Sequence, residues 1–129
     1  MCKASKLSKL RHHAFLNQNG RCYYCGYPMW EGNPEAFARL AGLSLEQAKR
    51  FQCTAEHLQA RQDGGRDVEE NIVAACVCCN QRRHYLRPAP DPARYRSIVQ
   101  KHLAIGSWHR KVMRKLLDAI AFPQPGTSS

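Results

Sequence analysis

The sequence has no apolar run that approaches the length of a membrane-spanning helix, so we expect no transmembrane segment. Acidic residues are scarce, because the 129-residue chain has 10 Asp and Glu against 20 Lys and Arg. The N-terminus is basic, but no apolar stretch follows it, as a secretory signal would require. We therefore expect a cytoplasmic protein without a membrane partner.

The shortage of acid is confined to the two ends of the chain. Residues 1–20 contain four Lys and Arg and no acid, and residues 86–129 contain eight Lys and Arg and two acids. Residues 21–85 contain eight of each sign. A neutral centre with basic ends is typical of a protein that binds a polyanion, most simply nucleic acid. Basic flanks that only keep the protein soluble would give the same pattern.

The seven cysteines form an odd set in a chain without a secretion signal, which argues against a disulfide framework. Two Cys-x-x-Cys pairs stand out, Cys22 with Cys25 and Cys76 with Cys79, and two such turns can close a tetrahedral zinc shell. Cys78 competes with Cys79, but the two-residue spacing from Cys76 favours Cys79. The alternative is a set of buried or redox cysteines without metal. The cysteines left over are Cys2, Cys53 and Cys78.

The hydrophobic pattern predicts a single domain with a modest core that a structural metal would help to hold. It predicts strands at residues 53–58 and 71–75 with a polar loop between them, followed by a helix at residues 78–86. Further helices are expected at residues 5–18, from 34 to 42, from 44 to 51, from 91 to 106 and from Ser107 onward, where one face would carry Trp108, Val112, Leu116 and Ile120.

These elements divide the chain into four parts. We expect a basic N-terminal helix at residues 1–20 and a zinc-bound core at residues 21–87, with a helical insertion at residues 33–52. A linker rich in proline then leads to a helical extension at residues 88–122. Residues 123–129 are expected to be a flexible tail.

Between the cysteine pairs and directly after the second pair lies a polar set suited to phosphodiester hydrolysis. His57 can take a proton from water, since imidazole titrates near neutral pH. Asn80 and His84 are four residues apart and share one face of the predicted helix. Together with Glu56 they can bind one divalent cation and leave some of its coordination positions open. Mg²⁺, Mn²⁺, Ni²⁺ and Zn²⁺ are candidates.

The segment AEHLQARQDGGRDVEENIVAACVCCNQRRH, with the Cys22 and Cys25 pair, resembles the core of the HNH endonuclease family. The resemblance implies an α+β fold, a zinc-stabilised ββα-metal core that is treble-clef-like and carries flanking helices. It also implies a metal-dependent endonuclease that hydrolyses nucleic acid with one divalent cation. DNA is the expected partner, and RNA stays open.

The resemblance also assigns roles to single positions. Glu56 resembles the first acidic metal ligand and His57 the general base. Asn71 resembles the middle Asn, which orients the loop and the base. Asn80 resembles the third signature residue, a metal ligand, and His84 an additional ligand of the colicin-type branch. The chain departs from the family pattern in having Glu where Asp is commoner and Asn where the family name implies His.

Three arginines are candidates for contact with phosphate: Arg66 in the loop, and Arg82 and Arg83 on the predicted helix. They could equally form a solvated face. The sequence leaves open a zinc-organised nucleic-acid-binding module without catalysis, and a protein-interaction domain with exposed apolar stripes. A monomer or a weak dimer is expected.

Overall fold

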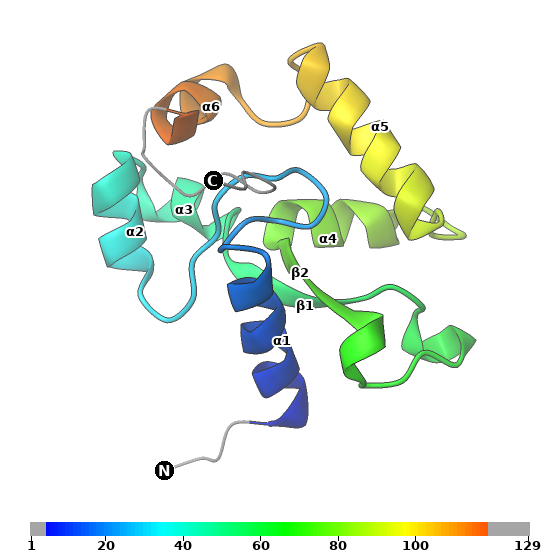
Figure 1. The fold of residues 1–129 in the computed structure, drawn as a ribbon. Coiled ribbons are helices and arrows are strands. Elements are labelled where there is room, and N and C mark those ends of the chain that lie inside the picture. Colours follow the sequence, from blue (N-terminus) through cyan, green and yellow to red (C-terminus); the bar gives the residue numbers. More distant parts are fainter. Residues whose placement is uncertain (1–4, 119–129) are drawn as a thin grey trace, which may run out of the picture.

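The computed structural model describes residues 5–118 of the chain. A two-stranded hairpin lies at its centre and helices pack around it (Figure 1). The elements in chain order are α1 (Lys6–Asn17), α2 (Pro34–Ala41), α3 (Leu45–Lys49), β1 (Cys53–His57), the 3₁₀ turns η1 (Arg61–Asp63) and η2 (Glu69–Asn71), β2 (Ile72–Cys76), α4 (Val77–Tyr85), α5 (Pro92–Ala104) and α6 (Lys111–Asp118).

The hairpin and the helix after it form a ββα unit. β1 and β2 are antiparallel, with Cys53 opposite Cys76 and His57 opposite Ile72. α4 follows β2 without a connecting loop, because the Cys76 sulfur accepts the amide hydrogen of Cys79 and so caps the helix. The expected α+β class, with cysteines grouped at the junction of strand and helix, is confirmed.

The N-terminal helix packs against the same hairpin as α4. Its side of the interface buries Ala14, with Leu7 and Leu10 half-buried, as the spacing of these residues predicts. The Gln18 amide then pairs with the backbone of β2, donating to the carbonyl of Ala74 and accepting from its amide. This contact satisfies backbone groups that would otherwise lie on an open strand edge.

The helical insertion has the caps that its sequence predicts. Asn33 caps α2, Pro34 follows at the first position, and Gly42 ends the helix with φ of 74°. Ser44 and Gln47 form a complete capping box at α3, with hydrogen bonds of 3.0 and 2.9 Å. The insertion thus consists of two short, well-capped helices.

The last helix does not have the expected bounds. It begins at Lys111 and not at Ser107, so Trp108 precedes it. The predicted stripe is therefore wrong in register. Trp108 is not helical, so a residue four positions after it does not have to lie on the same face. Val112 is 53% exposed as a result.

The buried face of α6 is formed by Met113 and Leu117, with Leu116 partly buried beside them. These side chains complete a second hydrophobic core with Phe37 and Phe51 of the insertion. Ile120, also predicted on this face, lies outside the described residues, as do Cys2 and the segment 123–129. The insertion and the C-terminal extension are thus packed on each other, although about sixty residues separate them in the sequence.

The first core surrounds the cysteine-bearing turns and includes α5. Asp91 and Pro92 begin this helix, and Tyr95 and Val99 are buried beneath it. The Tyr95 hydroxyl donates a 2.6 Å hydrogen bond to the carbonyl of Cys79. The helix is thereby attached to the ββα unit by a buried polar contact as well as by apolar packing.

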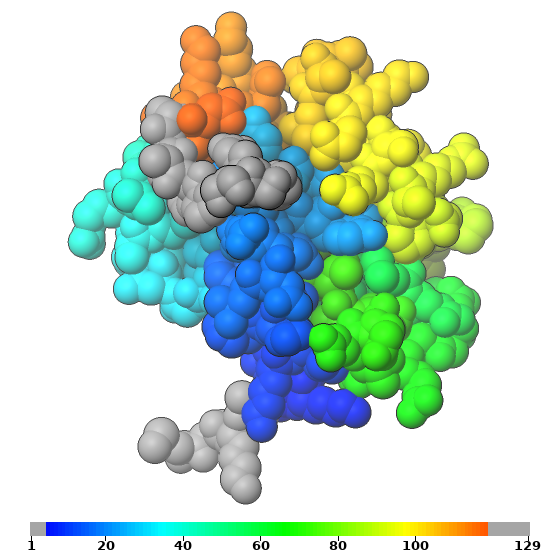
Figure 2. Space-filling model, in the orientation of Figure 1, coloured from blue at the N-terminus to red at the C-terminus, as the bar shows by residue number. Residues whose placement is uncertain are grey.

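The N-terminal helix and the C-terminal helices lie in different parts of the molecule. Figure 2 shows α1, in blue, in the lower part of the molecule and the C-terminal helices, in yellow and orange, in the upper part. Among the described residues, no helix is long and apolar enough to cross a membrane.

Candidate metal centre and polar pocket

The four cysteines of the two Cys-x-x-Cys pairs meet at one point. The sulfurs of Cys22, Cys25, Cys76 and Cys79 all lie within 4.8 Å of one another, and all four residues are buried. Cys25 and Cys76 are 4.0 Å apart at sulfur. A tetrahedral zinc ion with bonds of about 2.3 Å needs sulfurs about 3.8 Å apart. The cluster therefore has the donors and the spacing that a closed zinc site requires.

Backbone amides surround this cluster and point at its sulfurs. The amides of Tyr24 and Cys76 donate to the Cys22 sulfur at 3.4 and 3.3 Å, and the Trp108 indole donates to Cys79 at 3.3 Å. Such donors stabilise thiolates and orient metal ligands. Burial raises the pKa of the Cys25 thiol well above its usual range, so a bound cation would be needed to keep this sulfur deprotonated.

The two described cysteines outside the cluster, Cys53 and Cys78, are also buried. Cys53 lies on β1, where burial raises the pKa of its thiol to about 12. Cys78 accepts a hydrogen bond from Arg50 at 3.1 Å and does not belong to the four-sulfur group. The two-residue spacing therefore identifies the right cysteine at the end of the second pair.

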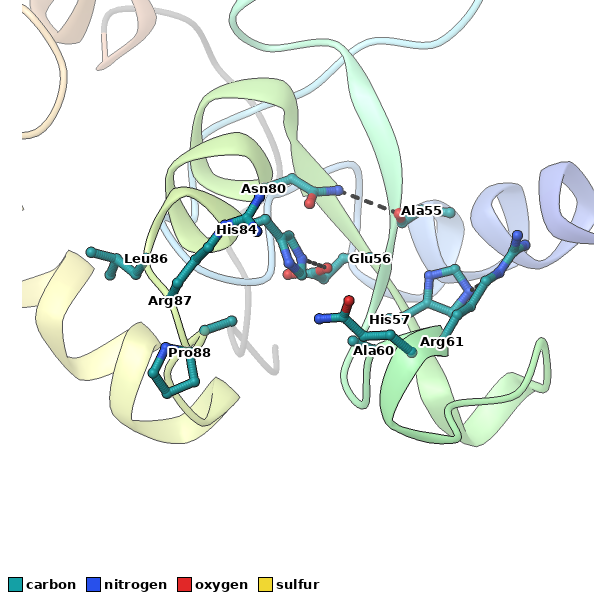
Figure 3. A pocket seen from close by; sticks show the side chains of 12 residues that line it. Ala55, Glu56, His57, Ala60, Arg61, Asn80, His84, Leu86, Arg87 and Pro88 are labelled. Carbon is teal, nitrogen blue, oxygen red and sulfur yellow. Dashed lines mark hydrogen bonds and ion pairs between the residues drawn. The ribbon is translucent and has the colours of Figure 1, made fainter.

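A polar pocket of about 570 Å³ lies on the other side of α4. Figure 3 shows Glu56 reaching into it from β1, and Asn80 and His84 from α4. His57 and Arg61 lie together at one side, and Arg87 lies with the proline-rich linker at the other. The full lining is Ala55, Glu56, His57, Ala60, Arg61, Gln62, Asn80, His84, Leu86, Arg87, Pro88 and Ala89.

Glu56 is the most buried polar group of the pocket, with 1% of its surface exposed. One carboxylate oxygen, Oε2, accepts from the Tyr24 hydroxyl at 2.9 Å and from Arg83 at 3.1 Å. The other, Oε1, is 2.9 Å from Nε2 of His84. Burial raises the pKa of Tyr24, as does the Glu56 charge, so Tyr24 stays protonated and can donate.

Asn80 is held by its amide nitrogen. Nδ2 donates to the hydroxyl of Thr54 at 3.0 Å and to the carbonyl of Ala55 at 3.3 Å. The carbonyl oxygen of the side chain accepts no hydrogen bond within residues 5–118. Asn80 Oδ1, Glu56 Oε1 and His84 Nε2 are thus one amide oxygen, one carboxylate oxygen and one imidazole nitrogen on the same pocket, a mixed set that suits a divalent cation with open positions.

His57, the neighbour of Glu56 on β1, makes a different set of contacts. Its Nε2 is 2.7 Å from Oδ1 of Asp67, and both side chains are partly exposed. Arg61 bonds the same carboxylate, at 2.8 Å from Nη2 to Oδ2. These bonds lower the pKa of Asp67, that from His57 most, so this carboxylate stays ionised.

Asn71 fastens the loop that carries these partners. Its Oδ1 accepts the amide of Gln59 at 2.8 Å, and its Nδ2 donates to the carbonyls of Gln59 and Arg66, both at 3.0 Å. Both ends of the loop are thereby tied to one side chain. At the tip, a Cβ added to Gly65 would lie 1.7 Å from the Gln59 carbonyl oxygen, so only glycine fits there.

The three arginines expected to contact phosphate have different surroundings. Arg66 is exposed in the loop. Arg82 is exposed, with its guanidinium 4.7 Å from the centre of the Trp108 ring, and it does not line the pocket. Arg83 is only 4% exposed and bonds Glu56 and the carbonyls of three other residues, so in this conformation it has no free face for a phosphate.

Two other arginines line the pocket. Arg61 and Arg87 line the pocket from opposite walls (Figure 3). Neither arginine was predicted from the sequence as a pocket residue, and neither was Asp67. An acidic residue ten positions after a base histidine, in a loop closed by an Asn, is a signal that could have pointed to Asp67.

Comparison with known proteins adds one finding. Residues 45–86 match the HNH endonuclease family model. The matched segment of the chain is therefore similar to an HNH endonuclease domain. No curated protein and no solved structure matches the chain significantly.

The HNH segment contains β1, the loop, β2 and α4, and hence every side chain discussed for the pocket except Tyr24, Arg87 and the linker beside it. It contains Cys76 and Cys79, whereas Cys22 and Cys25 lie outside it. The cysteine cluster thus joins the HNH segment to the preceding turn, and the match indicates a nuclease-type function.

Proposed function

We propose that this protein is a metal-dependent endonuclease that nicks DNA at the polar pocket. The observation that carries the proposal is that His57, Glu56, Asn80 and His84, which come from two elements, line a single open pocket with an arginine on each side. A base, three cation donors and two phosphate-binding groups are the components that phosphodiester hydrolysis needs.

Each residue has a separate task in this proposal. Asn80 Oδ1, Glu56 Oε1 and His84 Nε2 would hold one divalent cation, which supplies a Lewis acid to polarise the phosphate and balance the charge of the departing oxygen. Arg61 and Arg87 bind phosphate oxygens on the two sides of the scissile bond. The buried Arg83 holds Glu56 in place.

His57 acts as the general base. Its Nδ1 takes a proton from water while the water oxygen bonds to phosphorus and the bond from phosphorus to the ester oxygen breaks. The ester oxygen leaves with the electron pair and is protonated by solvent. One such pocket per chain cuts one strand, so the expected product of plasmid cleavage is the nicked circle.

The test is plasmid nicking by zinc-loaded protein with added Mg²⁺, Mn²⁺, Ni²⁺ or Zn²⁺. His57→Ala is expected to reduce the rate by roughly 10²-fold or more while DNA affinity and folding are retained. His12→Ala is the matched control, since His12 is an exposed histidine on α1 and does not line the pocket. Wild-type activity in the His57 variant would refute the proposal.

His57 is a sharper test than Glu56. Removing the Glu56 carboxylate would leave the buried Arg83 guanidinium unpaired, at a cost of about 3–5 kcal/mol of stability. Loss of activity in such a variant would not separate catalysis from folding. His57 is partly exposed and bonds a loop residue, so its truncation leaves the buried ion pair intact.

One observation, the ion pair between Glu56 and Arg83, favours a second function in which no catalytic cation is bound. Arg83 already neutralises this carboxylate, and a neutralised carboxylate attracts a cation less strongly. A zinc-organised module that binds nucleic acid without cutting it would need no second metal. Binding with a steep salt dependence, and no cleavage with any of the four metals, would establish this alternative.

A further inference from the structure

The loop between β1 and β2 brings a carboxylate to the base histidine. Asp67 Oδ1 lies 2.7 Å from His57 Nε2, and the exposed fractions of the two side chains are 30% and 16%. Asp67 is ten residues from His57 in the sequence, and it lies on the loop side of the imidazole and not among the residues that line the pocket.

The position of the imidazole hydrogen follows from these contacts. An ionised carboxylate only accepts, so Nε2 must carry the hydrogen in a 2.7 Å contact with Asp67. Arg61 Nε is 3.3 Å from the same nitrogen, but it is also 3.3 Å from Asp67 Oδ1. Donation to His57 would require a lone pair on Nε2, which the carboxylate would repel, so Arg61 bonds Asp67.

Nδ1 of His57 is then the nitrogen with a lone pair. It makes no hydrogen bond with any residue between 5 and 118, and His57 lines the pocket. This is the nitrogen that the proposed function needs as a proton acceptor.

We infer that Asp67 is a positioning residue that holds His57 in the Nε2–H tautomer and leaves Nδ1 free to accept a proton from water. This inference rests on the proposed endonuclease function. Asp67 does not touch substrate, and it acts through His57.

The surroundings of Asp67 support a fixed position. Arg61 bonds both carboxylate oxygens, and Asn71 holds the carbonyl of Arg66, the residue just before Asp67. The loop therefore supplies a carboxylate whose position and ionisation are both set by neighbouring groups. A catalytic base gains most from a partner that is itself held in place.

The decisive variant is Asp67→Asn. Arg61 still requires an acceptor opposite Nη2, so the amide oxygen of Asn turns to Arg61 and the NH₂ group faces His57. Nε2 must then accept, the hydrogen moves to Nδ1, and the base is blocked. A similar exchange in serine proteases lowers turnover by about 10⁴-fold through the wrong tautomer.

The experiment measures kcat and KM for DNA nicking, together with ¹⁵N chemical shifts of the His57 ring at a pH where it is neutral. Asp63→Asn is the matched control, because it removes the same charge from an exposed residue of the same loop. We expect Asp67→Asn to lower kcat by roughly 10²-fold or more with KM within about twofold, and to move the hydrogen to Nδ1. The control should match the wild type in both readouts.

The outcomes separate this inference from the function on which it rests. If the wild type cleaves and Asp67→Asn has the wild-type kcat, or loses kcat with Nε2–H retained, the positioning role is refuted and the endonuclease stands. If the wild type cleaves with none of the four metals, the proposed function fails, and the catalytic role of Asp67 fails with it. Thermal denaturation of the variant excludes unfolding as the cause of a lower kcat.

Discussion

The cysteine cluster and the polar pocket share one helix but differ in almost every physical respect. Cys79 and Asn80 are adjacent on α4, yet Cys79 is fully buried among like sulfurs while Asn80 faces an open pocket with oxygen and nitrogen donors. Closed four-ligand shells are typical of structural metal sites, and open mixed shells are typical of catalytic ones. The cysteine cluster therefore anchors α4 in the core, whereas the pocket leaves polar side chains of α4 open to solvent.

This comparison predicts that damage at the cluster abolishes folding, whereas damage at the pocket does not. The largest effect is expected from Cys76→Ser or from zinc removal by a chelator. Structural zinc contributes about 10 kcal/mol or more of apparent folding energy in small domains, comparable to the stability of the whole chain. Circular dichroism should show loss of helix, and retention of the wild-type spectrum without zinc would contradict a structural role for the cysteine cluster.

A substitution in the second core would test whether the insertion and α6 unfold together with the rest of the chain. Met113 is 2% exposed, and Met113→Ala should cost about 2–5 kcal/mol of unfolding free energy. Val112, its neighbour on the exposed face, is the matched control, and Val112→Ala should change stability by at most about 0.5 kcal/mol. A larger cost for Val112→Ala than for Met113→Ala in urea denaturation would mean that α6 has the register expected from the sequence.

His109 adds a dependence of stability on pH. It is 1% exposed between Tyr27 and Phe51, and neither ring nitrogen has a partner in the described part of the chain. Burial, and secondly the charge of Arg50, lower the pKa of His109 to about 4.

The folded pKa of His109 lies below the unfolded value of 6.5, so the folded chain favours the neutral ring. The free energy of unfolding is therefore unaffected by His109 above pH 6.5. It falls by about 3 kcal/mol as the pH drops towards 4, because the buried ring would have to take up a proton. His109→Phe should remove that loss, so the stability difference between variant and wild type should grow on acidification. A constant difference across this range would contradict the burial of His109. Both proteins contain the same cysteine cluster, so any loss of stability from protonation of its thiolates cancels when the two are compared.

The smallest effect on stability is expected in the pocket. His84 is 39% exposed at its side chain and contributes one hydrogen bond to Glu56. His84→Ala should therefore cost about 1 kcal/mol, while nicking should require a higher concentration of the divalent cation. Tyr85→Ala is the control, since Tyr85 is 85% exposed and does not line the pocket. Unfolding of the His84 variant would show that the pocket, like the cluster, holds the fold together.

The sequence predicted the features that depend on local rules. The start of the short helix after Ser44 and the spacing of Cys76 and Cys79 each follow from the chemistry of a few neighbouring residues. The junction of β2 and α4 was predictable for the same reason, since the hydrophobic pattern changes period there.

The features that were missed depend on contacts between distant segments. Arg83 is buried because Glu56, on another element, lies opposite it, and nothing in a basic helical stretch distinguishes an inward arginine from outward ones. Asp67 reaches His57 only because Asn71 closes the loop. The register of α6 is set by its packing on the insertion and not by Trp108, which belongs to the other core.

The central claim is that the pocket between β1 and α4 hydrolyses phosphodiester bonds with His57 as base. The most direct measurement is the single-turnover rate of DNA nicking by zinc-loaded wild type and His57→Ala, with a divalent cation and with or without added imidazole. We predict that the variant is at least roughly 10²-fold slower and that imidazole restores part of the rate. A folded variant that nicks DNA at the wild-type rate without imidazole would contradict the account.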